Sequence, residues 1–359
     1  MDIQRSEFAL IAKYFQARTA QNQTSSFSAT KSATNSASTQ QQFSSSSSLS
    51  LNSENKSRRD VAVSIGDDAA VVIPPADCGI AVTTDTMVAG VHFDDRVPVA
   101  ALGHKLVAVN LSDLAAMGAE PAWLSLSCTL PKINEEWLAE FSSGFFKAVD
   151  YYRCALIGGD VTKGPLSLTL TAQGIVPKER YLTRKGAQPG DRIYVSGTLG
   201  DAALALAAQQ QRVQLSDAAF SALEKRLFYP TPRVGLGQLL RNLATSAIDL
   251  SDGLAGDLSH ILQASGVGAH IELHRLPRSK AFAESVNSAD GWVYQLAGGD
   301  DYELCFTVPA SRCGMLETIA VQAGVSVTQV GIIEGNKGLR YFNKNERCDL
   351  QLESFSHFA

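Results

Sequence analysis

Beyond Arg59, short β-rich runs alternate with segments of helical periodicity, and this alternation restricts the chain to folds that mix strands with helices. The 359 residues exceed what one hydrophobic core usually holds, and 45% of them are apolar. We therefore expect two domains of α/β or α+β type. In the first half, the expected strands are 69–73, 79–84, 122–130, 154–159 and 166–176, and the expected helices are 101–117 and 135–150.

The segment 185–201 contains four glycines and a proline and precedes a new strand and helix start, which is typical of a domain boundary. We accordingly assign residues 1–184 to an N-terminal domain and residues 185–359 to a C-terminal domain. In the second domain the sequence predicts helices near 201–210, 217–227 and 254–264, strands at 268–273 and 302–308, and a final α/β unit that ends near Phe342.

The N-terminal segment differs in composition from the rest. Residues 6–18 place Phe8, Ile11 and Phe15 at helical spacing behind Ser6, an N-cap residue type, and this predicts a short helix. From 19 to 57, Ser, Gln, Thr, Asn and Ala dominate, so the stretch buries too little apolar surface to offset its ordering entropy. We expect a disordered insertion that acts as a solvated linker, with a flexible lid near a site as the alternative.

Charge and cysteine usage exclude several function classes. The chain has 31 basic and 36 acidic residues, a net charge of −5, and no long basic run, which argues against nucleic acid as a partner. No apolar run reaches the ~18 residues that span a bilayer, so no membrane partner is expected. The six cysteines form no C-x-x-C pair, and we expect reduced thiols in a cytoplasmic protein.

Aspartates recur where a strand runs into a glycine or a turn. At a single position such a residue usually caps its own backbone. Several together would repel each other and raise each other's pKa unless cations neutralised them. Mg²⁺ fits such oxygen ligands best, whereas the histidines and cysteines lack zinc-ligand spacing. The aspartates are Asp67, Asp68, Asp85, Asp113, Asp160, Asp249, Asp252, Asp300 and Asp301.

Common nucleotide and hydrolase motifs are absent from the sequence. It contains no G-x-x-x-x-G-K-[ST] loop, no H-R-D or D-F-G set and no G-x-S-x-G elbow. A nucleotide would therefore have to bind at a site that these motifs do not describe.

Eight blocks in order give the chain a family resemblance: IGDDAAVV, TTDTMVAGVHF, KLVAVNLSDLAAMGAEPAW, LIGGD, LTRKGAQPGD, IYVSGTLGD, AIDLSDGL and GGDDYELCF. Together they resemble the thiamine-monophosphate kinases. The resemblance implies the two-domain fold shared with aminoimidazole-ribonucleotide synthetase and selenophosphate synthetase, with a mixed-sheet N-terminal domain for ATP and metal and a C-terminal α/β domain. It also implies a homodimer through the N-terminal domains, and a reaction that converts ATP and thiamine monophosphate to ADP and thiamine diphosphate.

The resemblance further implies roles for individual residues. Gly159, Asp160, Arg184 and Ser251 are expected to contact ATP, and His92, Asp300 and Phe355 the acceptor. The family usually has Glu at the position of Asp300 and Trp or Tyr at that of Phe355, so both positions depart from its pattern, as does the insertion 19–57. The implied ligands of several Mg²⁺ ions are Asp68, Thr83, Thr84, Asp85, Asp113, Asp160, Asp249 and Asp252.

No general base is assigned, because a phosphate monoester is already largely ionised near pH 7. We expect direct in-line transfer of the γ-phosphoryl group, with a phosphohistidine or phosphoaspartate intermediate as the rival. The alternative functions are another ATP-dependent phosphoryl-transfer enzyme of the same fold and a catalytically silent Mg²⁺-nucleotide sensor.

Overall fold

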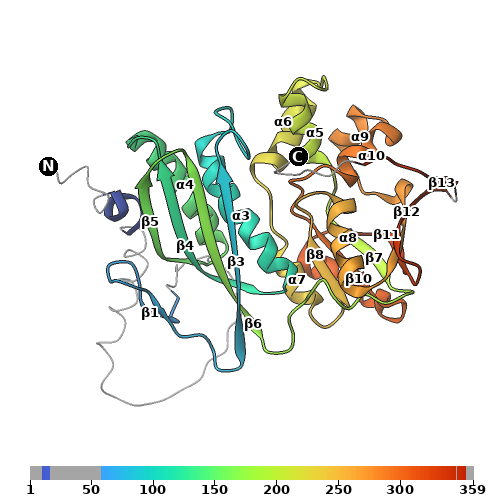
Figure 1. Cartoon of the computed structure of the whole chain (residues 1–359), viewed down its shortest axis with the longest axis horizontal. Coiled ribbons are helices and arrows are strands. Elements are labelled where there is room, and N and C mark those ends of the chain that lie inside the picture. The colour runs from blue at the N-terminus through green and yellow to red at the C-terminus, as the bar shows by residue number, and fades with distance from the viewer. Residues whose placement is uncertain (1–9, 17–57, 345, 353–359) are drawn as a thin grey trace, which may run out of the picture.

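The computed structural model describes residues 10–16, 58–344 and 346–352, which form a four-stranded and a seven-stranded β-sheet flanked by helices, and a small two-stranded sheet of β1 and β2 (Figure 1). The elements up to residue 177 are η2 (Ala12–Gln16), β1 (Val61–Val63), β2 (Val71–Val72), β3 (Cys78–Val88), α3 (Val99–Ala116), β4 (Glu120–Leu130), α4 (Glu135–Tyr151), β5 (Ala155–Lys163) and β6 (Ser167–Pro177).

The later elements begin at residue 192. They are β7 (Arg192–Ser196), α5 (Asp201–Gln209), α6 (Asp217–Phe228), α7 (Val234–Leu240), β8 (Ser246–Asp249), α8 (Leu254–Ser265), β9 (Gly268–Glu272), η3 (Leu273–Arg275), α9 (Lys280–Ser285), α10 (Ser288–Leu296), β10 (Leu304–Val308), η4 (Ala310–Met315), α11 (Leu316–Ala323), β11 (Val327–Glu334), β12 (Gly338–Asn343) and β13 (Glu346–Cys348).

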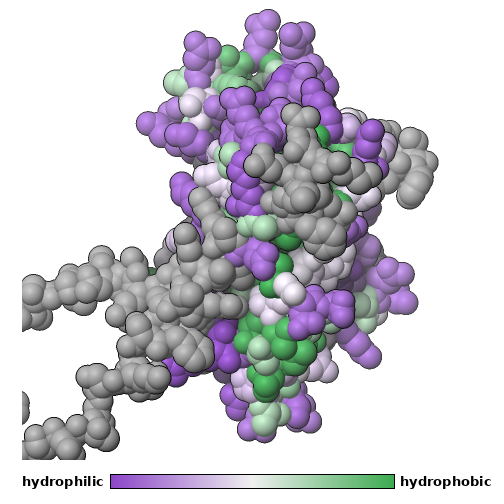
Figure 2. Space-filling view, turned by 90° about the vertical axis from the view of Figure 1, so that its left-hand side faces the viewer, coloured by the Kyte–Doolittle hydropathy of each residue, from purple (hydrophilic) through white to green (hydrophobic). Residues whose placement is uncertain are grey.

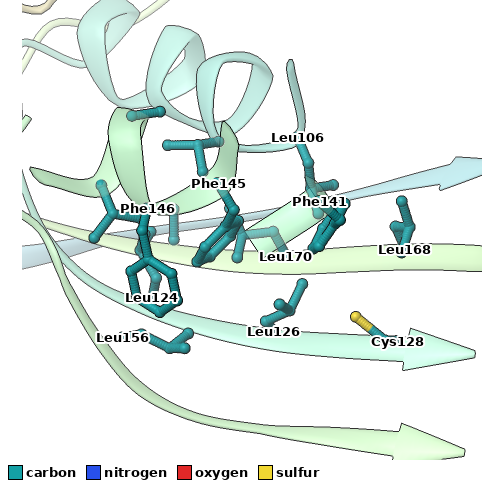
Figure 3. Packing of buried hydrophobic residues seen from close by; sticks show 14 of the residues in the cluster. Leu106, Leu124, Leu126, Cys128, Phe141, Phe145, Phe146, Leu156, Leu168 and Leu170 are labelled. Atoms are coloured by element: carbon teal, nitrogen blue, oxygen red, sulfur yellow. The ribbon is translucent and has the colours of Figure 1, made fainter. Parts of the chain in front are cut away.

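The first sheet has the strand order β3-β6-β4-β5, with β4 and β5 parallel and the other pairs antiparallel. Helices α3 and α4 cover one face of it, and their leucines and phenylalanines form a core with the inward residues of the strands (Figure 3). The two helices approach closely, because a Cβ on Gly144 would lie 1.8 Å from the Ala100 carbonyl oxygen. This core fixes the position of α3 against the sheet.

The second sheet has seven strands in the order β13-β12-β9-β11-β7-β10-β8. Alternation along its strands sends residues such as Ile193 and Val195 to the core beneath α8, while Leu304 and Phe306 face the core formed with α7 and α11. Helices therefore cover both faces of this sheet.

Helix α3 joins the two halves of the molecule. It is buried nearly all round, as expected of a helix that is apolar on every side. Its last turn, at Ala115 and Ala116, belongs to the core of α7, β8 and β10. A Cβ on Gly237 of α7 would lie 2.0 Å from the Ala115 carbonyl oxygen, so this approach requires glycine. The helix is thus held by both sheets.

The α/β class predicted from the sequence is confirmed, and most elements fall where the periodicity placed them. Strand β3 is longer than predicted, because it pairs with β6 over eleven residues. Of the helix expected over 6–18, residues 10–16 are helical, with Ala12–Gln16 in the π form, while Ser6 and Phe8 lie outside the described residues. The insertion 19–57 and Phe355 also lie outside them.

Within the described part of the chain, no helix combines the length and the apolar character needed to cross a bilayer.

Candidate active site

Three aspartates lie within electrostatic reach of one another where α3 packs against β3 and β8. Asp85 comes from β3, Asp113 from α3 and Asp249 from the end of β8, so both sheets contribute a carboxylate. The Thr83 hydroxyl, two residues before Asp85 on the same face of β3, donates to Asp113 Oδ2. We call Thr83, Asp85, Asp113 and Asp249 the carboxylate cluster.

Burial and mutual repulsion perturb these carboxyls. Burial, and then the charge of Asp113, raises the pKa of Asp85 to about 6. The same two causes, in the same order, raise the pKa of Asp249 well above its usual range. The pKa of Asp113 is also raised by burial, although the Thr83 hydroxyl and the charge of Arg184 oppose this effect. The cluster therefore carries a charge that the folded protein does not fully compensate.

Two loops of the second sheet border this cluster. Residues 250–253 follow β8, and residues 297–303 lead into β10. They are joined by hydrogen bonds from Asp300 N to Ser251 O (2.9 Å) and from Tyr302 N to Leu250 O (2.8 Å). Burial, and then the charges of Asp300, Asp85 and Asp249, raises the pKa of Tyr302 well above its usual range. The Tyr302 phenol, itself on the Asp300 loop, is thus within electrostatic reach of the cluster.

The first turn of α8 fixes the turn after β8. Asp257 accepts hydrogen bonds from the backbone N–H groups of Ser251 and Asp252, both at 3.0 Å. Burial raises the pKa of Asp257 to about 7. The exposed side chain of Arg184 acts electrostatically on both Asp113 and Asp257. Arg184 is therefore placed to meet an anion bound between the cluster and this turn.

A separate cavity of about 660 Å³ opens at the β5 edge of the first sheet. It gathers three of the predicted site residues, Asp68, Gly159 and Asp160, beside apolar side chains that include Phe15. Gly159 approaches β4 so closely that a Cβ there would lie 1.9 Å from the Leu126 carbonyl oxygen. The cavity could accept an apolar group next to exposed carboxylates.

The pairing register places the predicted ligands on two faces of the first sheet. Directly paired residues share a face, and Asp160 connects through β4 and β6 to Thr86 of β3. Thr84 shares that face, where its hydroxyl lies 2.9 Å from that of Thr171. Asp85 lies on the opposite face. The structure thus divides the predicted ligands among the carboxylate cluster, the turn after β8 that holds Asp252, and the other side of the first sheet.

The donor atoms of the carboxylate cluster are all oxygens, the ligand type that Mg²⁺ prefers. Within residues 10–16, 58–344 and 346–352, no three His, Cys, Asp or Glu side chains lie close enough together to hold a metal ion. The chemistry of the cluster nevertheless fits Mg²⁺, because the charge of Asp113 raises the pKa of both Asp85 and Asp249 and a cation would remove that repulsion. The Thr83 hydroxyl adds a neutral oxygen.

Of the residues predicted to contact the acceptor, two are described. His92 lies in the exposed turn after β3, where its Nδ1 accepts a hydrogen bond from Val88 N at 3.0 Å. Asp300 forms an ion pair with Lys105 of α3, with Asp300 Oδ2 and Lys105 Nζ 3.0 Å apart. Sequence reasoning missed Lys105, Tyr302 and Asp257. A signal existed for Lys105, because it and Asp113 are the two charged residues of an otherwise neutral, largely apolar helix.

Two family models match the chain and define the class of protein to which it belongs. Residues 66–176 match the family model "AIR synthase related protein, N-terminal domain", and residues 188–342 match "AIR synthase related protein, C-terminal domain". The protein is therefore a two-domain AIR synthase related protein.

Individual relatives narrow the class. A thiamine-monophosphate kinase of Escherichia coli K12 is 49% identical over 305 residues, which cover 84% of this chain and 94% of the relative. The crystal structure of the thiamine-monophosphate kinase from Stenotrophomonas maltophilia K279a has 46% identity and a TM-score of 0.75, covering 79% of this chain and 92% of that one. AaThiL complexed with AMPPCP and TMP has 30% identity and a TM-score of 0.70, covering 82% and 92%. The chain belongs to the thiamine-monophosphate kinase family.

Proposed function

We propose that this protein transfers the γ-phosphoryl group of ATP to the phosphate of thiamine monophosphate, giving ADP and thiamine diphosphate. The observation that carries the proposal is the carboxylate cluster, to which both sheets contribute. The Asp300 loop lies near this cluster and its Tyr302 interacts electrostatically with it. Relatives that are thiamine-monophosphate kinases, and a relative that holds AMPPCP and TMP, support the same reaction.

Charge repulsion is the main obstacle to such a reaction, because donor and acceptor are both anions. A single pair of like unit charges ~4 Å apart costs about 4 kcal/mol at an effective dielectric constant of 20. Several Mg²⁺ ions, when bound, would neutralise phosphate charge and align the reacting oxygens. The residues proposed to hold them are Asp68, Thr83, Thr84, Asp85, Asp113, Asp160, Asp249 and Asp252.

The chain's other residues bind and orient the two substrates. In this proposal Gly159, Asp160 and Ser251 contact ATP, and Arg184 presents a charge that stays positive at any working pH to a phosphate. His92, Asp300 and Phe355 hold the acceptor.

We further propose direct in-line transfer. An oxygen of the acceptor phosphate, largely ionised near pH 7, forms a bond to the γ-phosphorus while the bond from that phosphorus to the β,γ-bridging oxygen breaks and ADP leaves. No side chain then needs to act as a general base. With ATP made chiral at the γ-phosphorus, this scheme predicts inversion, whereas net retention would indicate a phosphoenzyme intermediate.

Incubation of the full chain with ATP, Mg²⁺ and thiamine monophosphate tests the function. Thiamine diphosphate, separated by chromatography and detected as its fluorescent thiochrome, should form in step with ADP. ATP binding without turnover would indicate a nucleotide sensor. ADP formation that requires a different acceptor would indicate a sibling enzyme of the same fold.

We also propose that the protein is a cytoplasmic homodimer. The outer face of β3 exposes Ile80 (44%) and Val82 (62%). Viewed from the left-hand side of Figure 1, the molecule also shows an apolar patch on its surface (Figure 2). A second copy seated there would bury such a patch. All six cysteines are free thiols, as suits a reducing compartment. Light scattering should give the mass of a dimer, and that of a monomer for Val82→Lys.

A further inference from the structure

Helix α3 carries a buried lysine that the proposed reaction does not use. Lys105 is 7% exposed, and an ammonium group so far from water requires an anionic partner. That partner is Asp300, on a loop of the other half of the molecule, with Lys105 Nζ and Asp300 Oδ2 3.0 Å apart. The pair therefore connects the helix of the carboxylate cluster to the loop proposed to face the acceptor.

Asp300 is held on both carboxylate oxygens. Lys105 approaches Oδ2, and the Tyr302 hydroxyl donates to Oδ1 at 3.1 Å. The backbone of this loop is unusual, because Asp300 (φ 69°) and Tyr302 (φ 48°) both adopt the left-handed conformation that L side chains rarely occupy. Such a conformation persists where the surroundings enforce it, here by the hydrogen bonds to Ser251 and Leu250. The loop keeps one orientation of the Asp300 carboxylate at a conformational cost.

Two properties make this carboxylate suitable for binding a ligand. The Asp300 side chain is still 28% exposed, although the side chain of its partner Lys105 is buried. A carboxylate offers about four lone-pair positions, of which Lys105 and Tyr302 use two. Among the described residues no other hydrogen bond to the Asp300 carboxylate occupies the remaining positions, which can accept N–H groups. Tyr302 is also within electrostatic reach of Asp85 and Asp249, so a ligand of Asp300 would lie near the proposed site of transfer.

We propose that Lys105 is a positioning residue for acceptor recognition: it fixes the Asp300 carboxylate so that its free lone pairs receive an N–H donor of the acceptor. The inference rests on the proposed function, and it assigns to Lys105 an effect that passes entirely through Asp300. Lys105 and Asp113 are eight residues apart, about 12 Å along the helix axis. One rigid helix would thus set the spacing between acceptor recognition and the carboxylate cluster.

The test measures affinity for thiamine monophosphate by calorimetry, and KM and kcat by turnover, in the full-length protein. Lys105→Met keeps the apolar stem and removes the charge. It should raise the Kd and KM for thiamine monophosphate about tenfold or more, as loss of a charge-assisted contact does, and change the KM for ATP less than twofold. Lys105→Arg, which retains the charge, should recover part of the loss. Lys147→Met, an exposed lysine of α4, serves as the matched control and should behave as wild type.

The decisive comparison is a double-mutant cycle. In an Asp300→Asn background, Lys105→Met should change the Kd for thiamine monophosphate less than twofold, because the carboxylate it positions is gone. An undiminished effect in that background would overturn the proposal and indicate that Lys105 contacts the ligand itself. Unchanged affinity in the single variant would also overturn it. Turnover by the wild type is scored separately, so a wild type that makes no thiamine diphosphate refutes the proposed function, and the inference with it.

Discussion

Asp113→Asn distinguishes the effect of the carboxylate cluster on folding stability from its effect on catalysis. The substitution removes one negative charge with little change of volume, and the amide oxygen can still accept the Thr83 hydroxyl. If the cluster exists to hold cations beside phosphates, the variant should turn over at least ~10²-fold more slowly, as loss of electrostatic transition-state stabilisation usually causes. The same variant should be more stable than wild type in the absence of metal.

The expected gain in stability follows from the pKa values. The pKa of Asp85 in the folded protein, about 6, lies above its ordinary 3.8, and Asp113 contributes to that rise. A carboxyl with a raised pKa stabilises the fold fully below its unfolded pKa, and this stability is lost as the pH rises through about 6. Removing Asp113 should therefore restore about 1–2 kcal/mol at pH 8 and less at pH 5.

Urea denaturation in EDTA at the two pH values measures the stability, and the rate of thiamine diphosphate formation with Mg²⁺ measures the activity. Asp349→Asn, which removes an exposed carboxylate paired with Arg347, should change neither quantity. Near-normal turnover by Asp113→Asn would refute the role of this carboxylate, and a metal-free variant less stable than wild type would refute the electrostatic reasoning.

Three further outcomes are expected. Burial raises the pKa of Asp257 from 3.8 to about 7, which corresponds to about 4 kcal/mol of folding free energy. Wild type in EDTA should therefore lose stability between pH 4 and 7, and Asp257→Asn should lose less stability over the same range in parallel urea titrations. Glu303 is fully buried between two arginines, so Glu303→Gln should lower the free energy of unfolding by about 3–5 kcal/mol. The exposed control Glu284→Gln should lower it by less than ~0.5 kcal/mol, with both values measured by chemical denaturation. Deletion of the Ser- and Gln-rich residues 20–56 should leave the melting temperature and turnover close to wild type; an insoluble or inactive product would show that the segment contributes to the fold or the site.

The spacing of apolar residues along the sequence predicts most of the fold, because residues that share a face by this spacing are buried together in the structure. The helix predicted over 101–117 and the strand predicted over 122–130 both form, since their apolar residues face cores that neighbouring segments complete. The strand predicted from Tyr302 instead begins at Leu304, because Asp300 and Tyr302 adopt left-handed backbone conformations. The hydrogen bonds to residues 250–251 hold this left-handed backbone, and the pattern of residues 297–308 alone does not reveal those contacts.

The candidate site was less accessible to sequence reasoning. The sequence predicts one set of aspartates around Mg²⁺, and the structure brings Asp85, Asp113 and Asp249 within electrostatic reach of one another but places Asp160 on the other face of the sheet. The face on which Asp160 lies depends on its register through β4 and β6, and no pattern within β5 specifies that register. The partner of Lys105 is likewise set by tertiary packing. A lysine in an apolar helix indicates a buried anion, but the identity of that anion emerges only from the folded chain.

The claim that aspartates of both sheets hold divalent cations for ATP is tested most directly by titrating ATP into the protein in a calorimeter. Wild type should bind ATP in Mg²⁺ and lose that binding in EDTA, and Asp249→Asn should weaken the Mg²⁺-dependent affinity at least ~10-fold. ATP affinity that is the same in Mg²⁺ and EDTA, or unchanged in Asp249→Asn, would contradict the account.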